Sequence, residues 1–179
     1  MSISRKYGRT MHFSFSPGTT SDDRINSNWY ANISKIDNVL NLEKLDGENQ
    51  CLNGIGVFAR SHAAPTRHAW SNHFKSKFSV IKNDLKENNL EIFGENMYAI
   101  HSIIYPKLDS HFYVFGVRVL DKWLSWDEVK WYSDFFEYPT VPVISEYKVS
   151  DLTEIEITNK VISEASNSSK FLSLQKMSS

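Results

Sequence analysis

The sequence contains a single cysteine, Cys51, and no long apolar run. One cysteine excludes an internal disulfide framework and a cysteine-based zinc site, and this is typical of a protein in a reducing compartment. No stretch approaches the roughly 18 apolar residues of a membrane-spanning helix, and the basic N-terminus lacks the apolar core of a signal peptide. We therefore expect a cytoplasmic protein with no membrane partner.

The sequence also lacks an excess of charge of either sign. Its 179 residues include 20 Lys and Arg against 21 Asp and Glu, so the formal net charge is -1. No global field would draw the chain to nucleic acid, and a polyanionic partner must be held by a local patch. The composition is 41% hydrophobic and 13% aromatic, which is typical of a globular domain.

Strand signals occur in the first and middle parts of the chain. Residues 39–45 predict a strand that ends near Lys44, and "ENQCL" and "GVFAR" predict a hairpin around Asn53 and Gly54. Two further strands are predicted by "EIFGENMYAI" and "HFYVFGVRVL", and "PTVPVI" is predicted to be extended.

Helix signals alternate irregularly with these strands. Apolar residues at three- and four-residue spacing predict an amphipathic helix over 66–88, and a Ser-x-x-Glu capping box at Ser125 predicts another helix through Phe136. Residues 1–36 resemble loops or short elements lying on a core formed later. This order favours the α+β class, with antiparallel or mixed sheets and packed helices. We expect one domain over 1–150, followed by a C-terminal helix and polar tail over 151–179.

One lysine stands among acidic residues in "NLEKLDGEN". On a strand, Lys44 and Asp46 would share one face, and Gly47 would let the backbone turn and a ligand approach the main chain. Spacing alone favours an ordinary surface lysine at a charged sheet edge. The functional interpretation depends on further motifs in a fixed order.

Four motifs together resemble the ATP-dependent RNA ligase family, within the covalent nucleotidyltransferase superfamily. They are "EKLDGEN", "FARS", "IFGEN" and "FYVFGV", and the similarity runs from near residue 5 to about residue 145. The resemblance implies an ATP-grasp-like nucleotidyltransferase (adenylation) domain. It also implies ATP and Mg²⁺ or Mn²⁺ as cofactors and RNA ends as substrates.

The resemblance assigns a role to each motif. Lys44 would be the catalytic residue that becomes linked to AMP. A free lysine has a pKa near ~10.4, so its amine must be activated by burial or by nearby positive charge before it attacks the α-phosphate. The implied nucleotide-binding residues are Glu43 (adenine), Asp46 (ribose or a metal), Gly47, Asn49 and Arg60 (nucleotide or its phosphate), Glu95 (ribose) and Phe115 (stacking on the base).

The sequence departs from the family after "FYVFGV". The Glu-Gly-x-Val strand and the Lys-x-Lys pair that relatives carry are missing, and Gly116 stands where many ligases have Asp. We expect a C-terminally incomplete domain, which is either a shortened ligase or a divergent member. Self-association, or a partner that completes the domain, is then expected.

Three functions remain open at this stage. The first is an RNA ligase that seals 5′-phosphate and 3′-hydroxyl ends in RNA repair, and the second is a catalytically inactive nucleotide- or RNA-binding remnant. The third is a DNA ligase or capping-type relative. Which RNA is sealed is not encoded in any motif, and no pair of histidines has a recognised zinc spacing, so the metal ligands are unknown.

Overall fold

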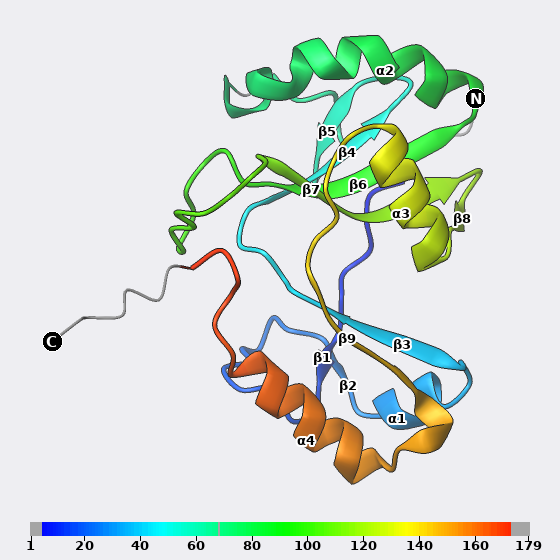
Figure 1. Ribbon diagram of the computed structural model, residues 1–179, viewed down its shortest axis with the longest axis vertical. Helices are drawn as coiled ribbons and strands as arrows, with labels where there is room; N and C mark the ends of the chain where they lie inside the picture. Colours follow the sequence, from blue (N-terminus) through cyan, green and yellow to red (C-terminus); the bar gives the residue numbers. More distant parts are fainter. Residues whose placement is uncertain (1–4, 68, 173–179) are drawn as a thin grey trace, which may run out of the picture. The chain divides into compact units, whose positions relative to one another are not determined.

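The computed structural model describes residues 5–67 and 69–172, which form two compact units (Figure 1). Unit 1 is Lys44–Val141 together with the segments up to Tyr7 and from Lys170. Unit 2 is Gly8–Glu43 and Pro142–Ser169. The chain passes from unit 2 to unit 1 directly at Lys44, so the predicted nucleophile is the first residue of its segment.

Unit 1 is built on a five-stranded antiparallel sheet with the order β5-β4-β6-β7-β8. The predicted hairpin and the two predicted strands that follow it are all present. A β-bulge between Phe93 and Gly94 interrupts the register of β6 and β7 and leaves Phe115 as the extra residue. The strands are β4 (Glu48–Asn53), β5 (Val57–Ala59), β6 (Leu90–Asn96), β7 (Phe112–Val119) and β8 (Lys122–Trp123).

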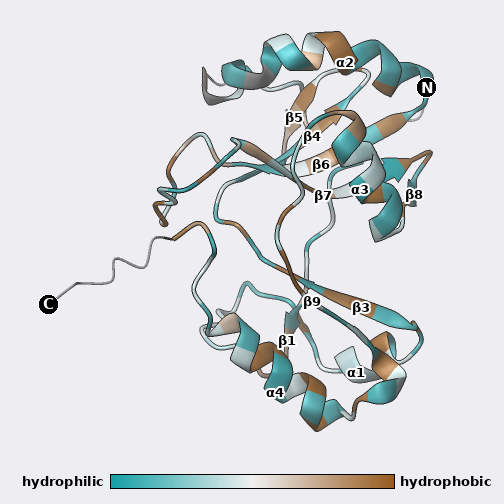
Figure 2. Ribbon diagram, in the orientation of Figure 1, coloured by the Kyte–Doolittle hydropathy of each residue, from teal (hydrophilic) through white to brown (hydrophobic). Residues whose placement is uncertain are grey.

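Helices α2 (Lys75–Glu87) and α3 (Trp126–Phe135) cover one face of this sheet. Helix α2 buries Phe78, Ile81 and Leu85, whose spacing of three and four residues places them on one side of the helix. The burial of each such side chain contributes about 1.5–3 kcal/mol. Figure 2 shows apolar residues on the strands beneath these helices.

The opposite face of the sheet has a different lining. Cys51, Phe58 and Phe93 are buried there, and Tyr7 and Phe115 pack against them. Alternation along paired β4 and β6 places Asn49 and Glu95 on this same face, since each lies two residues from Cys51 or Phe93. The predicted nucleotide-binding residues of the sheet therefore lie opposite the helices.

Unit 2 has its own small core, made by Trp29, Val149 and Ile157. Strands β3 and β9 pair antiparallel although they are more than 100 residues apart in sequence. Helix α4 begins at a second capping box, formed by Thr153 and Glu156. The elements are β1 (His12–Phe13), β2 (Ile25–Asn26), α1 (Trp29–Ile33), β3 (Asn38–Leu42), β9 (Val143–Lys148), η2 (Val149–Asp151) and α4 (Glu154–Ala165).

The α+β prediction is confirmed, and so are the capping box at Ser125 and the helix that follows it. The predicted helix over 66–88 starts later, because the 3₁₀ helix η1 (Ala69–Phe74) precedes α2. Phe171 is buried, and its ring contacts those of Tyr105 and Tyr113. The polar composition after residue 165 did not indicate this burial.

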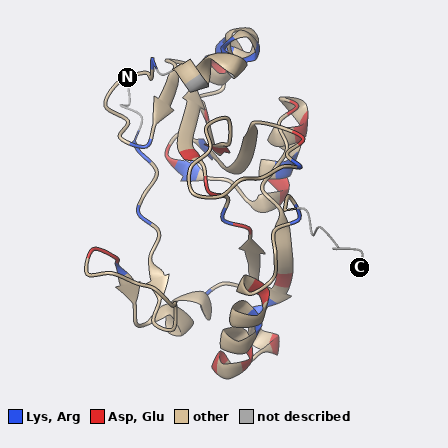
Figure 3. Cartoon of the chain, turned by 90° about the vertical axis from the view of Figure 1, so that its left-hand side faces the viewer, with Lys and Arg blue, Asp and Glu red and all other residues tan. Residues whose placement is uncertain are grey.

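The composition has nearly equal numbers of basic and acidic residues, and the fold does not separate them. Basic and acidic residues are interspersed along the chain (Figure 3). Among the helices of residues 5–67 and 69–172, none has the length and apolar character that a bilayer requires.

Candidate nucleotide site

Lys44 lies in the segment between β3 and β4, and its side chain is exposed. The sequence predicted a strand that continues to residue 45, whereas β3 ends at Leu42. Beyond β3, the side chain of Leu45 is 2% exposed and anchors the segment to unit 1. Lys44 is exposed to solvent on a chain that is fixed one residue later.

Gly47 is fixed by a close approach to β6. A Cβ atom at this position would lie 2.5 Å from the carbonyl oxygen of Asn96 and 2.6 Å from Sδ of Met97. The backbone N–H of Gly47 donates to Oε1 of Glu95 at 3.2 Å. The glycine predicted from the motif is thus needed for the contact between the lysine segment and Glu95.

Glu95 lies at the centre of the predicted set. It pairs with Asn49 across β4 and β6. Burial raises the pKa of its carboxyl to about 7, while the Gly47 hydrogen bond and the positive charges of Lys44 and Arg60 act in the opposite direction. These interactions show that the lysine, the arginine and the glutamate share one electrostatic environment.

Arg60 is exposed and directly follows Ala59, the cross-strand partner of Gln50. This position lies beside the β4 residue Asn49. The sequence motif "FARS" therefore places its arginine at the end of a short edge strand, next to the row formed by Asn49 and Glu95.

Asp46 is held by a segment that the sequence did not connect with the site. Its Oδ2 accepts hydrogen bonds from the Ser102 hydroxyl at 2.5 Å and from the backbone N–H groups of Ser102 and Ile103 at 2.8 and 3.0 Å. These bonds, led by the Ser102 hydroxyl, lower the pKa of Asp46. The Tyr105 hydroxyl lies 3.2 Å from the backbone nitrogen of Asp46, which donates to it. Ser102, Ile103 and Tyr105 thus position Asp46, and no motif signals them.

Phe115 is the bulged residue of β7 and is half-buried. Its ring meets the ring of Tyr7 edge-on, with centroids 5.0 Å apart and an interplanar angle of 71°. Tyr7 also contacts Phe93 and Trp123. The predicted base platform is therefore part of an aromatic cluster to which the N-terminal segment contributes, which its sequence did not reveal.

Gly116, the departure from the family pattern, has a local explanation. A Cβ atom there would lie 3.2 Å from Cζ3 of Trp123 on the neighbouring strand β8. Packing of the indole over this position leaves little room for an aspartate side chain.

Glu43 is the one predicted residue that falls in unit 2. Its backbone N–H donates to the carbonyl oxygen of Pro142 at 2.9 Å, and its side chain is half-buried. The described contacts do not connect Glu43 with Glu95, whereas Lys44, Asp46, Gly47, Asn49 and Arg60 all approach that residue.

Comparisons with known proteins identify the family and the fold of the chain. A family model described as RNA ligase matches residues 37–173, and no curated protein sequence gives a significant match. An archaeal ATP-dependent RNA ligase is similar in structure, with a TM-score of 0.54 and 17% identity over 72% of this chain and 36% of its own.

Two further solved structures are similar. An RNA ligase of Naegleria gruberi has a TM-score of 0.52 and 18% identity, and the match covers 69% of this chain and 42% of that one. A candidate ATP-dependent DNA ligase from Aquifex aeolicus has a TM-score of 0.52 and 15% identity, covering 74% and 39%. The chain thus spans less than half the length of each. With its fold and more than half of its sequence matched, the chain belongs to the RNA ligase family and has a ligase-type nucleotidyltransferase fold.

Proposed function

We propose that the chain is an ATP-dependent RNA ligase-type nucleotidyltransferase in which Lys44 forms a covalent bond with AMP. One observation carries the proposal: the Gly47 backbone donates to the half-buried carboxyl of Glu95 at 3.2 Å, and the charges of Lys44, Asp46 and Arg60 lie near the same carboxyl. These residues come from three separate motifs, and they meet on the sheet face that the helices leave uncovered.

The proposed reaction has three steps. The Lys44 amine loses its proton and attacks the α-phosphorus of ATP, so that a P–N bond forms and pyrophosphate leaves. A 5′-phosphate oxygen of RNA then attacks the same phosphorus, breaks the P–N bond and takes the AMP. Finally a 3′-hydroxyl attacks the RNA 5′-phosphate, and AMP leaves as the ends are sealed. Such sealing would serve RNA repair.

The residues present suit the groups that this reaction brings to the site. Arg60 supplies an exposed positive charge for a phosphate, and Phe115 supplies an aromatic face for a base. The carboxylates of Asp46 and Glu95 are hard oxygen donors, which suit Mg²⁺ or Mn²⁺ when phosphate oxygens provide further ligands. When bound, the ion would neutralise charge on the phosphates.

A second function is favoured by the contact between Tyr7 and Phe115. Because Tyr7 packs on Phe115, a base would have to share that platform with Tyr7, which would hold ATP away from the position that transfer to Lys44 requires. The chain would then be a binding module that takes up nucleotide or RNA without covalent transfer. In that case ATP would bind without modifying the protein.

The test is incubation with α-labelled ATP and Mg²⁺ or Mn²⁺, followed by denaturation. We expect label on the protein that is lost in Lys44→Ala and Lys44→Arg. The arginine variant keeps the positive charge but has a poor nucleophile. Lys35→Ala, which removes another exposed lysine, should label like the wild type.

Transfer to polynucleotides then distinguishes the acceptors. Labelled protein should pass its AMP to 5′-phosphorylated RNA, and preferential transfer to DNA would replace the RNA ligase assignment with a DNA ligase one. Absence of protein label from a folded chain would support the binding module.

A further inference from the structure

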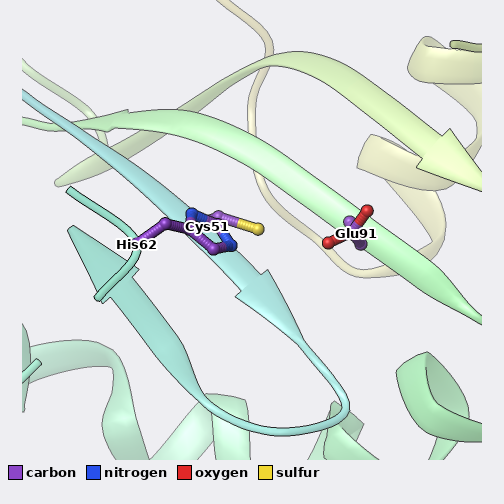
Figure 4. A group of neighbouring side chains, drawn as sticks. All are labelled: Cys51, His62 and Glu91. Atoms are coloured by element: carbon purple, nitrogen blue, oxygen red, sulfur yellow. The ribbon is translucent and has the colours of Figure 1, made fainter. Parts of the chain in front are cut away.

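A group of three metal-binding side chains, one buried and two half-buried, lies on the same sheet face as the candidate site but belongs to none of its motifs. Cys51, His62 and Glu91 offer Sγ, an imidazole nitrogen and a carboxylate oxygen, all within 4.8 Å of one another. Figure 4 shows that the three come from neighbouring elements: β4, the turn after β5, and β6. The residues are 11 and 29 positions apart, which explains why no spacing motif indicated them.

The register of β4 and β6 brings two of the three ligands together. Cys51 pairs with Phe93 and Asn53 pairs with Glu91, so Cys51 and Glu91 are diagonal neighbours on one face. Cys51 is 1% exposed, and its thiol lies in an apolar layer with Phe58 and Phe93. An apolar layer on the Cys51 side of a bound ion strengthens the bonds of the ion to its charged ligands.

The turn after β5 directs His62 into this layer. The backbone N–H of His62 donates to the carbonyl oxygen of Ala59 at 2.9 Å, and its φ of 57° is in the left-handed region. The imidazole stacks on Phe58 with centroids 4.6 Å apart and planes 8° apart. This stacking fixes the plane of the His62 imidazole beside the Cys51 thiol.

Arg118 orients the third ligand. Its Nε donates to Oε2 of Glu91 at 2.6 Å, and its Nη2 donates to the carbonyl oxygen of Arg5 at 2.5 Å. The guanidinium also lies over the rings of Phe93 and Trp123. A carboxylate has two oxygens, so an outer partner on one of them can fix the direction of the other, as is common around metal ligands.

We propose that Cys51, His62 and Glu91 form a binding site for a Zn²⁺ ion, with a fourth position open to water. Sulfur, imidazole and carboxylate are the ligand types that Zn²⁺ takes, and Mg²⁺ would not choose a thiolate. The single cysteine excludes a zinc site built on several thiolates, but one thiolate completed by an imidazole and a carboxylate is a different ligand set, which was not predicted from the sequence. Zinc bonds of about 2.0–2.3 Å place tetrahedral ligands about 3.3–3.8 Å apart, so the side chains need to close by about 1 Å. The Cys51 proton leaves to solvent as the Zn–S bond forms.

The charges of the site are compatible with a divalent ion. The Cys51 thiolate and the Glu91 carboxylate balance the two positive charges of Zn²⁺, and Arg118 leaves a single positive charge in contact with aromatic rings. A bound ion would tie the turn that carries Arg60 to strands β4 and β6. The site does not depend on whether Lys44 accepts AMP.

The experiment titrates metal-stripped full-length chain with Zn²⁺ against a chelating dye, and separately with Co²⁺ while absorbance is recorded. We expect one equivalent of Zn²⁺, a rise in melting temperature, and a sulfur-to-cobalt charge-transfer band. His62→Ala should weaken Zn²⁺ binding at least ~10-fold. Cys51→Ser should abolish the charge-transfer band, and Mg²⁺ should give neither effect.

The control is His101→Ala, which removes an exposed histidine outside the group and should bind Zn²⁺ like the wild type. Because Glu91→Gln also removes the partner of the buried Arg118, the half-exposed His62 is the decisive position. Equal zinc affinity in His62→Ala and wild type, or Co²⁺ binding without the band, would overturn the proposal.

Discussion

At the scale of single residues, the protonation of Glu95 makes the stability of the chain depend on pH. Burial raises its pKa to about 7 from an ordinary value of 4.5, so between these two pH values the folded chain holds a proton that the unfolded chain has lost. Stability from this group is complete below about 4.5 and declines as the pH rises to 7. The full effect is at most about 3 kcal/mol, because each pKa unit corresponds to about 1.4 kcal/mol.

Glu95→Gln should remove this pH dependence. The amide stays neutral and its oxygen can still accept from Gly47, so we expect wild-type stability near pH 4 and greater stability than wild type at pH 8. Denaturant unfolding at pH 4, 5, 6, 7 and 8 measures this difference. The exposed Glu87→Gln serves as the control and should run parallel to the wild type. Parallel curves for Glu95→Gln as well would contradict the assigned burial.

Gly47 makes a second prediction at this scale. In Gly47→Ala the new methyl group would overlap the Asn96 carbonyl and Met97 sulfur, so the lysine segment must move away from Glu95. We expect a loss of about 1–3 kcal/mol in unfolding free energy, together with weaker labelling by ATP. Gly8→Ala, where no heavy atom lies within 4 Å, should change stability by less than about 0.5 kcal/mol. Unfolding curves that place both variants within that limit would show that the close approach is wrong.

Motif residues could be chosen from the sequence, and their structural partners could not. The order of "EKLDGEN", "FARS" and "IFGEN" pointed to Lys44, Arg60 and Glu95, and each motif lies on or beside one strand of the same sheet. The roles of these three residues remain predictions. Ser102 and Tyr105 form hydrogen bonds with Asp46. They lie in a segment more than 50 residues away that contains no motif. Their role depends on the path of a loop, which local sequence does not determine.

At the scale of elements, the capped helices are the parts that local sequence specifies best. Ser125 and Glu128 form a complete capping box at the start of α3, with each side chain bonded to the backbone of the other residue. The motif is visible in the sequence because all its parts lie within four residues. Helix α2 was predictable for a similar reason, since its buried residues follow the helical period.

Removal of this cap gives a prediction for α3. Ser125→Ala should lower the unfolding free energy by about 1 kcal/mol, because backbone N–H groups at the helix start lose their acceptor. Ser76→Ala, an exposed change inside α2, should stay within about 0.5 kcal/mol of the wild type. Thermal or denaturant unfolding decides this, and equal stabilities for the two variants would show that the cap contributes nothing.

Strand ends were poorly predicted from the sequence, and long-range pairing was not predicted at all. The apolar alternation of residues 39–45 predicted a longer strand, whereas β3 ends at Leu42 and unit 1 begins two residues later, at Lys44. The pairing of β3 with β9 joins segments separated by most of the chain, and no local pattern encodes such a partner. Lys44 is consequently presented by a linking segment and not by the end of a strand.

At the scale of the whole molecule, the chain belongs to the RNA ligase family and shares its fold with ligases of which the match covers less than half. The α+β class followed from the irregular order of elements, whereas the division into two units did not, because each unit combines distant segments. The boundary predicted at residue 150 remains a prediction. The proposed activity of this ligase-type fold depends on whether Lys44 reacts with ATP.

The most direct measurement is the intact mass of the protein after incubation with ATP and Mg²⁺ or Mn²⁺, with peptide mapping of any adduct. We expect the addition of one AMP per chain, located on the peptide that contains Lys44. This addition should be absent in Lys44→Arg. An unmodified mass for a folded chain, or AMP on a different lysine, would contradict the proposed role of Lys44.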